Sequence, residues 1–284
     1  EIPVEQWRNE CLYLDWSEDA IQYKLGVLAD AIRQVNDGRG PDIIAFQEVE
    51  NVTILERLRT EYLEGLGYQP AVLLEGTDAR GIDLAFLSRL PLAKEPVLHP
   101  FDVPDFPERA GDTRGVLQAD FALPDGSVLT GFAVHFPAPY HPTPMREAAF
   151  EHLQTLRDSL PDEHLVFAAG DFNTTSTEDE RERMLDRYAR PHWTVAHDLG
   201  CEDCKGTYYY APDDNWSFLD TILFSPSRGE KTTGRLRADS VAIANDTPAQ
   251  VTPDGTPARH NSAARSGMSD HWPIIATIEV TQKQ

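Results

Sequence analysis

The sequence predicts an α/β protein organised as a four-layer sandwich, in which two packed β-sheets are flanked by helices. Three observations support this fold class. First, 284 residues with 40% hydrophobic content can bury a sizeable core, and we expect one domain spanning residues 1–284. Second, helical periodicity recurs in separate parts of the chain. Third, several strand candidates follow one another with no helix between them, which argues against a strictly alternating, doubly wound sheet.

Helices are predicted where apolar residues recur every three or four positions. Residues 21–32 have apolar side chains at positions 21, 25, 28, 29 and 32, which places them on one face of a helix. Glycines and Pro41 then end this segment. The same periodicity predicts helices over residues 51–66 and 145–160.

Strands are predicted from short apolar or alternating runs that lie between turn residues. They cover residues 42–46, 82–87, 116–121, 128–136, 165–169, 218–224, 240–244 and 273–280. The stretch over residues 247–267 is rich in Pro, Gly, Ser and Ala, and we expect it to be a mobile loop.

Polar residues with the chemistry of an active site occur in or directly after four of these strand candidates and shortly before a fifth. Taken singly, each has a structural explanation: Glu48 suits the first turn of a helix, and Asp171 with Asn173 suits an Asx turn. A lone histidine such as His135 is usually a core residue, whereas a carboxylate inside an apolar run, such as Asp220, is costly without a partner. Read together, they favour one site. The five groups are Gln47-Glu48, His135, Asp171 with Asn173, Asp220, and Ser269-Asp270-His271.

These residue types match the requirements of phosphodiester hydrolysis, which needs an activated water and neutralisation of phosphoryl charge. Glu48 and Asp270 are suitable ligands for Mg²⁺, or for Mn²⁺ or Ca²⁺ in its place. Asp171 is the natural group to polarise the attacking water, and the Asn173 amide can donate to a phosphoryl oxygen. His135 and His271 can each donate a hydrogen bond or proton to the phosphate; Asp220 and Asp270 are candidate carboxylate partners.

The order of these groups and the short sequence motifs that contain them resemble those of the endonuclease/exonuclease/phosphatase superfamily of DNase I-like hydrolases. The resemblance covers about residues 16–278. The resemblance implies the same four-layer sandwich, with the active site built from strand-end loops at one end. It implies a metal-binding role for Glu48 and a catalytic role for His135. The resemblance also assigns Asp171 and Asn173 to the Gly-Asp-x-Asn pair, Asp220 to a buried orienting aspartate, and Asp270 and His271 to the terminal Asp-His. Arg80, in the segment Asp78-Ala79-Arg80-Gly81-Ile82-Asp83, is similarly a candidate substrate contact.

One departure from the family pattern concerns the N-terminus. Family members usually begin with a strand that ends in a metal-binding asparagine, and no such strand is found here. Asn9 is a poor substitute, because no apolar run leads into it. We expect this first strand to be missing from the sequence rather than lost from a degenerate copy, which would have lost other site residues too.

The charge balance bears on the substrate. The chain has 25 basic and 47 acidic residues and a formal net charge of -22, which repels polyanions at long range. Cations in the site and a local basic rim would offset this repulsion. The excess of acidic residues is otherwise explained by a need for solubility or by a high-salt environment outside the cell. It mildly favours a small or membrane-borne phosphoester as the substrate. No apolar run approaches the roughly 20 residues that span a bilayer, and no signal-peptide pattern opens the chain, so we expect a soluble mature or trimmed protein.

Three cysteines form no disulfide framework, but Cys201 and Cys204 make a Cys-x-x-Cys motif in a predicted loop. Cys11 alone cannot complete a zinc site with them. A local disulfide and two inert thiols remain the alternatives. A disulfide implies an oxidising compartment, and with the acidity it points to an extracellular or periplasmic location.

Three functions remain in view. The first is a divalent-metal phosphodiesterase or nuclease, the second a phosphatase or lipid phosphodiesterase on the same scaffold, and the third a binding scaffold without activity. Two further features bear on the substrate. The aromatic run over residues 208–210 with Trp216 either stacks on bases or braces its loop, and Arg259 is a candidate phosphate contact.

Overall fold

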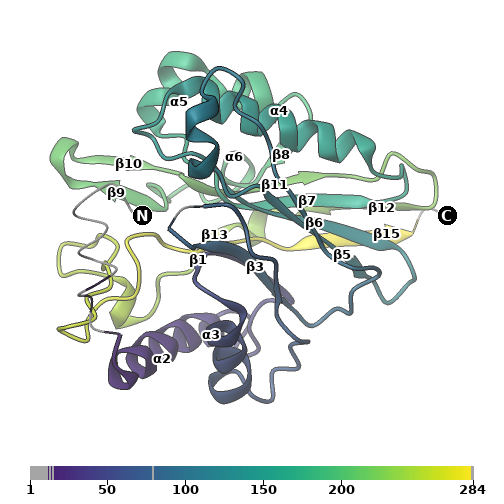
Figure 1. Ribbon diagram of the computed structural model, residues 1–284. Coiled ribbons are helices and arrows are strands. Elements are labelled where there is room, and N and C mark those ends of the chain that lie inside the picture. The colour runs from purple at the N-terminus through teal and green to yellow at the C-terminus, as the bar shows by residue number, and fades with distance from the viewer. Residues whose placement is uncertain (1–11, 13, 15, 79, 283–284) are drawn as a thin grey trace.

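The computed structural model has the four layers that the sequence predicts (Figure 1). It describes residues 12, 14, 16–78 and 80–282; Asn9 and Cys11 lie outside the described residues. Helices α4 and α5 cover one face of a six-stranded sheet, a three-stranded sheet packs on its other face, and α2 and α3 form the fourth layer. The predicted fold class is therefore confirmed.

The larger sheet has the strand order β4-β5-β6-β7-β11-β8, and the smaller sheet has the order β1-β3-β2. Two-stranded pairs β12-β15, β13-β14 and β9-β10 complete the strands. The strands are β1 (Ile43–Val49), β2 (Val72–Leu73), β3 (Asp83–Ser88), β4 (Val97–His99), β5 (Val116–Ala122), β6 (Val128–His135), β7 (Leu165–Asp171), β8 (Thr194–Val195), β9 (Tyr208–Tyr210), β10 (Asn215–Ser217), β11 (Asp220–Ser225), β12 (Thr232–Leu236), β13 (Ala242–Ile243), β14 (Ile274–Ile275) and β15 (Ile278–Gln282).

Helices lie on both outer faces, and short helical turns join the remaining segments. The α-helices are α2 (Glu18–Gln34), α3 (Val52–Arg57), α4 (Thr143–Ser159), α5 (Ser176–Glu182) and α6 (Ala196–Leu199). The π-helical segments are η1 (Leu58–Tyr62) and η3 (Leu185–Ala189), and the 3₁₀ turns are η2 (Pro107–Asp112), η4 (Ala211–Asp213), η5 (Ala238–Ser240) and η6 (Pro248–Gln250). Within the described ranges, we find no helix with the length and apolarity needed to cross a membrane.

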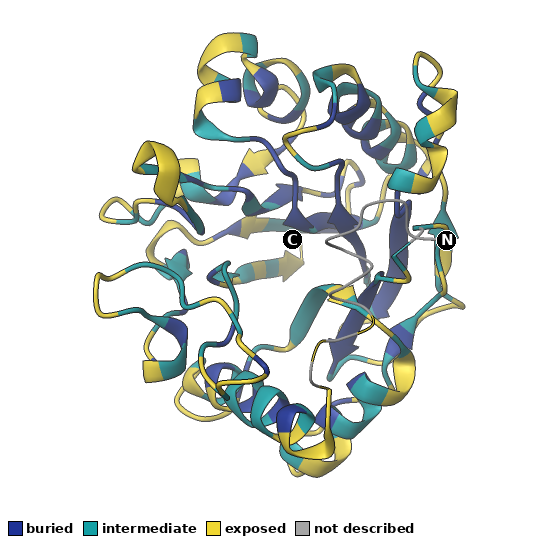
Figure 2. Cartoon of the chain, turned by 60° about the vertical axis from the view of Figure 1, so that its left-hand side comes forward, coloured by how far each residue is buried: buried dark blue, intermediate teal, exposed yellow. Residues whose placement is uncertain are grey.

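Aromatic side chains fill the space between the two sheets, where Figure 2 shows strands that are largely buried. The rings of Phe86 and Phe121 meet edge to face with centroids 5.5 Å apart, and Phe167 lies 6.3 Å from Phe86. A Cβ at Gly131 would lie 2.5 Å from the Phe167 ring, so glycine is required for this packing. Separate apolar clusters join the six-stranded sheet to α4 and the three-stranded sheet to α2 and α3.

The structure corrects several predicted elements. The helix predicted over residues 51–66 ends as an α-helix at Arg57 and continues as a π-helix to Tyr62. Leu58 and Leu63 are both 1% exposed although they are five residues apart, and the π-helical turn places both on the core side. The strand predicted over residues 240–244 shortens to Ala242–Ile243 after a 3₁₀ turn, and the one over residues 273–280 divides into β14 and β15.

The structure also describes the two segments that the sequence predicts as loops. Cys201 and Cys204 are joined by a disulfide, so the first of the two alternatives for this motif holds. The segment over residues 247–267 is linked to itself by backbone hydrogen bonds, including Ala258 N–H to the Gln250 carbonyl and Asn261 N–H to the Ser266 carbonyl. The mobility expected of this loop stays a prediction.

A buried ion pair joins α4 to α5 near the end of β6. Arg146 is 1% exposed; its Nε donates to Glu178 Oε2 at 2.9 Å, and its Nη1 donates to the Ala138 carbonyl at 2.7 Å. We expect Glu178→Ala to lower the free energy of unfolding by about 3–5 kcal/mol, because it leaves a buried guanidinium without its carboxylate. Denaturant unfolding measures this loss. Glu182→Ala, which removes an exposed pair on the same helix, is the control and should cost less than about 1 kcal/mol; equal losses would contradict the prediction.

Candidate active site

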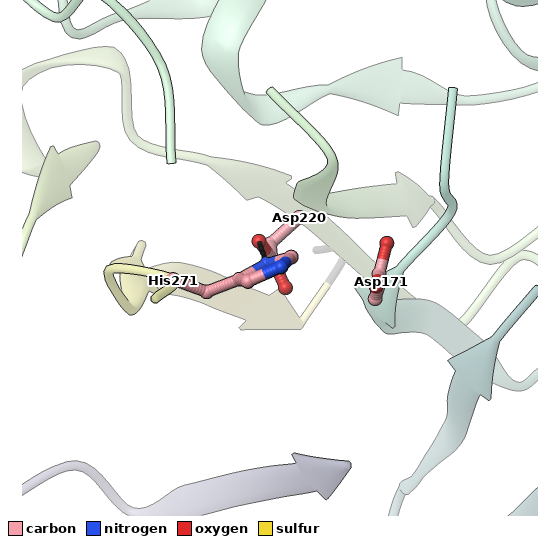
Figure 3. A group of neighbouring side chains, drawn as sticks. All are labelled: Asp171, Asp220 and His271. Carbon is pink, nitrogen blue, oxygen red and sulfur yellow. Dashed lines mark hydrogen bonds and ion pairs between the residues drawn. The ribbon is translucent and has the colours of Figure 1, made fainter. Parts of the chain in front are cut away.

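Three adjacent strands place three predicted site residues side by side. Strand β6 runs parallel to β7, with His135 opposite Asp171, and β7 runs antiparallel to β11, with Asp171 opposite Asp220. His271 approaches from outside this sheet, and its Nδ1 lies 2.7 Å from Asp220 Oδ2. Figure 3 shows Asp171 beside Asp220 and His271. One potential metal-ligand atom from each of the three residues lies within 4.8 Å of the others.

The turn after β7 fixes the direction of Asp171. Gly170 has φ +142°, and a Cβ there would lie 2.1 Å from the Val134 carbonyl oxygen, so the two strand ends approach closely only with glycine. Asp171 Oδ1 accepts the backbone N–H of Asn173 at 2.8 Å. Asn173 has φ +51° and donates its side-chain amide to the Phe136 carbonyl at 2.9 Å. One amide hydrogen of Asn173 thus supports the strand end, and the other is left for the predicted contact with a phosphoryl oxygen.

Burial and charge give the acidic and basic groups unusual protonation equilibria. Burial, with the neighbouring Asp220 carboxylate, raises the pKa of Asp171 to about 7. Burial acts to lower the pKa of His271, but the charge and hydrogen bond of Asp220, with Asp171 and Asp270, outweigh it and raise that pKa to about 10. A carboxyl poised near neutral pH therefore lies beside an imidazolium held charged by its aspartate.

His135 differs from His271 in its environment. Its Nε2 lies 3.5 Å from Asp171 Oδ2, and its side chain is only 7% exposed. Burial, together with the positive charges of Arg114 and Arg80, holds the pKa of His135 well below its usual range. His135 is therefore a neutral hydrogen-bonding group next to Asp171.

Glu48 and Arg80 lie at the same end of the sandwich, on the side of the smaller sheet. Glu48 interrupts the register of β1 with β3 and has φ +59°, a strained conformation for a residue with a side chain. Arg80 Nη1 lies 3.8 Å from Glu48 Oε1, and its Nε lies 3.4 Å from Asp78 Oδ1. The N-cap of α3 is Asn51 and the helix begins at Val52, so Glu48 does not lie in the first turn of that helix.

Asp270 lies within a group of charged side chains. Arg259 Nε is 3.9 Å from Asp270 Oδ2, and Lys24 Nζ donates to the carbonyl of Met268. Burial lowers the pKa of Lys24, while the charges of Asp270 and Glu48 act in the opposite direction. The side chains of Glu48 and Asp270 are 58% and 49% exposed. These open oxygen donors suit a hard divalent cation such as Mg²⁺.

Comparison with known proteins places this arrangement in a family. Residues 21–271 match the family model described as the Endonuclease/Exonuclease/phosphatase family. The chain belongs to this family. The match supports phosphoester hydrolysis as the general class of reaction. Enzymes of the family generally use divalent metals. No curated protein matches the chain.

Solved structures of the family share the fold at low sequence identity. A mannosyl-6-phosphatase from Bacteroides thetaiotaomicron is 18% identical, with 91% of each chain covered and a TM-score of 0.63. TDP2 from D. rerio, in complex with a single-strand DNA product, is 16% identical with a TM-score of 0.63, and 93% of this chain and 94% of that chain are covered. A family protein from Leptotrichia buccalis is 16% identical with a TM-score of 0.60, over 93% and 96% of the two chains.

An aromatic cluster beside the candidate active site packs within the loop that contains β9 and β10. Trp216 packs against Tyr209 and Trp272, with ring centroids 5.1 and 5.2 Å apart. Tyr208 lies 4.9 Å from His271. The contacts of Trp216 fit the brace interpretation.

Sequence reasoning missed Arg114, which donates hydrogen bonds to backbone carbonyls at the end of β6. Its side chain is 4% exposed, its Nε lies 2.9 Å from Asp78 Oδ2, and its Nη1 donates to the carbonyls of His135 and Phe136 at 3.3 and 3.2 Å. An arginine at the start of an apolar strand was the available signal, because a charged side chain there needs a buried partner. That partner, Asp78, belongs to the segment from which Arg80 was predicted.

Proposed function

We propose that this protein is a divalent-metal-dependent phosphodiesterase of the nuclease type, acting at the site formed by the ends of β6, β7 and β11. The observation that carries the proposal is the set of contacts around Asp171: His135 Nε2 lies 3.5 Å away, and the Asp220–His271 hydrogen bond of 2.7 Å lies beside it. An acid and a base with separated pKa values in one cluster are the arrangement that general acid–base catalysis requires.

Glu48 and Asp270 would hold the cation, Mg²⁺ or in its place Mn²⁺ or Ca²⁺. When bound, the cation supplies charge neutralisation at the phosphoryl oxygens and at the leaving oxygen. Both carboxylates are open to solvent, and both interact electrostatically with the same side chain, Lys24, which supports placing them in one region of the site.

The side chains of the chain itself perform the remaining steps. Asp171, ionised above about pH 7, orients the attacking water and accepts its proton. The charged His271, aligned by Asp220, donates to a phosphoryl oxygen and stabilises its growing negative charge. His135 donates as a neutral group, and the second amide hydrogen of Asn173 is directed to the phosphate. Arg80 contacts the substrate beside Glu48.

A phosphatase or lipid phosphodiesterase is the second candidate. The formal charge of -22 favours it, because a small phosphoester meets less long-range repulsion than a nucleic acid. The structures that share this fold include a mannosyl-6-phosphatase and a protein in complex with a single-strand DNA product, so the fold is compatible with both candidate functions. We further propose that residues 1–284 act as one domain, and that the Cys201–Cys204 disulfide suits an extracellular or periplasmic setting.

Metal removal tests the proposed function. Purified protein is incubated with plasmid DNA, RNA, bis-p-nitrophenyl phosphate and p-nitrophenyl phosphate in Mg²⁺, Mn²⁺, Ca²⁺ or EDTA. We expect cleavage of a diester with Mg²⁺ or Mn²⁺ and a loss of at least about 100-fold in EDTA, restored by added metal. Cleavage of the monoester alone would favour the phosphatase. Folded protein that binds metal and cleaves none of these substrates, nor inositol phosphates or sphingomyelin, would favour a scaffold without activity.

A further inference from the structure

One buried threonine connects the two segments that carry Asp220 and His271. Thr207 is 0% exposed and makes three hydrogen bonds. Its Oγ1 accepts the backbone N–H of Asp220 at 3.0 Å, its carbonyl accepts the N–H of Trp272 at 2.8 Å, and its N–H donates to the carbonyl of Ser217 at 2.9 Å. One residue thus contacts the first residue of β11 and the residue directly after His271.

The Asp220–His271 pair needs such a connection because the two residues belong to different parts of the fold. Asp220 is held on one side by its pairing with Asp171 on β7. On the other side, β8 pairs only with Leu223 and Phe224, so it ends before reaching Asp220. His271 lies outside the six-stranded sheet and joins the β9 segment through a bridge to Tyr208. Their 2.7 Å hydrogen bond therefore depends on what holds the segments together.

The segment before Thr207 is shaped to bring it close to β10 and β11. A Cβ at Gly206 would lie 2.6 Å from the Ser217 carbonyl oxygen, so only glycine permits the approach. The Cys201–Cys204 disulfide and the bond from Cys204 N–H to the Cys201 carbonyl close the turn that precedes it. Both features limit the freedom of the chain where it enters the contact.

We propose that Thr207 is a positioning residue that aligns Asp220 with His271 for phosphoester hydrolysis. This inference rests on the proposed function. Its hydroxyl is the acceptor for Asp220 N–H where no strand supplies one, and its carbonyl fixes the segment that carries His271. Thr207 itself does not touch the substrate; it acts through the geometry of the pair, and small displacements of catalytic groups have large effects on rate.

Three variants test the inference. Thr207→Val keeps the shape of the side chain and removes the hydroxyl, and Thr207→Ser keeps the hydroxyl. Thr221→Val is the matched control: Thr221 is 1% exposed, follows Asp220 on β11, and its Oγ1 lies 2.7 Å from His197 Nδ1, outside the site. We expect Thr207→Val to lower kcat about 10- to 100-fold with KM changed less than about twofold, and Thr207→Ser and Thr221→Val to stay within about threefold of wild type.

A second measurement does not depend on turnover. The imidazole proton between His271 and Asp220 should give a downfield ¹H NMR resonance, assigned by its loss in Asp220→Ala, which removes the acceptor. We expect it in wild type, Thr207→Ser and Thr221→Val, and we expect it to broaden or vanish in Thr207→Val. If Thr207→Val does not fold, Thr207→Ala takes its place.

The outcomes separate the two hypotheses. A resonance lost only without the Thr207 hydroxyl, in a protein that hydrolyses no phosphoester, would retain the positioning role and reject the proposed function. Thr207→Val with normal kcat and a normal resonance would overturn the inference, and so would equal losses in Thr207→Val and Thr207→Ser.

Discussion

Asp171→Asn should lower kcat by about 10²–10⁴-fold, whichever phosphoester proves to be the substrate. The amide has the shape of the carboxyl and can still accept the Asn173 N–H, but it cannot take a proton from water. Because burial and Asp220 place the pKa of Asp171 near 7, its carboxylate is an effective base at neutral pH. Steady-state kinetics on the active substrate measures the change.

Asp120→Asn is the matched control for this prediction. Asp120 is likewise buried, 1% exposed, but it lies on β5 with Lys94 Nζ 2.8 Å from its Oδ2, and it pairs with Thr130 rather than with the end of β6. It should change stability and leave kcat within about threefold. An Asp171→Asn protein that is folded by circular dichroism and retains more than a tenth of wild-type kcat would remove Asp171 from its role.

Asp220→Asn should move the whole pH–rate profile to lower pH. In the wild type, activity requires ionised Asp171 and charged His271, so kcat/KM should rise as pH passes about 7 and fall as it passes about 10. Loss of the Asp220 charge lowers the pKa of His271, and it also removes a repulsion that raises the pKa of Asp171. We expect the alkaline limb to move down by roughly 1–3 pH units and the maximum rate to fall by about 10²-fold.

Asp198→Asn serves as the control for that profile, because Asp198 lies 3.9 Å from His197 in a histidine–aspartate pair outside the site. It should leave both limbs in place. An alkaline limb that stays near pH 10 in Asp220→Asn would show that Asp220 does not hold His271 in its charged form.

The strands whose limits the sequence predicted well are those formed by a continuous apolar or alternating run of residues. Strands β3, β5, β6 and β7 are mostly buried runs, and their observed limits lie within two residues of the predicted ones. The pairs β9-β10 and β13-β14 are built from strands of only two or three residues, and runs this short carry too little periodicity to mark a strand and its limits. The π-helical segment after α3 was likewise not predictable, since its spacing follows from the core it meets rather than from a repeat in the chain.

The same distinction applies to the site. Asp171, Asp220 and His271 follow or begin apolar runs, and the structure brings them together. Arg114 and Thr207 contact backbone groups of residues that are distant along the chain. The charge of Arg114 at the start of an apolar strand was a local signal, but it did not show which carbonyls the side chain contacts, and no local pattern marks Thr207. The roles of Glu48, Asp270, Asn173 and Arg80 remain predictions that ligand binding and mutagenesis will decide.

The alignment of His135, Asp171 and Asp220 on neighbouring strands has a consequence for how this protein can vary. Successive side chains on a strand point to opposite faces, so inserting or deleting one residue within β6, β7 or β11 would turn its functional group away from the other two. The connections between these strands carry no such restriction and can lengthen or shorten at small entropic cost. New substrate preferences can therefore arise by loop exchange, while the reaction chemistry stays tied to strand length.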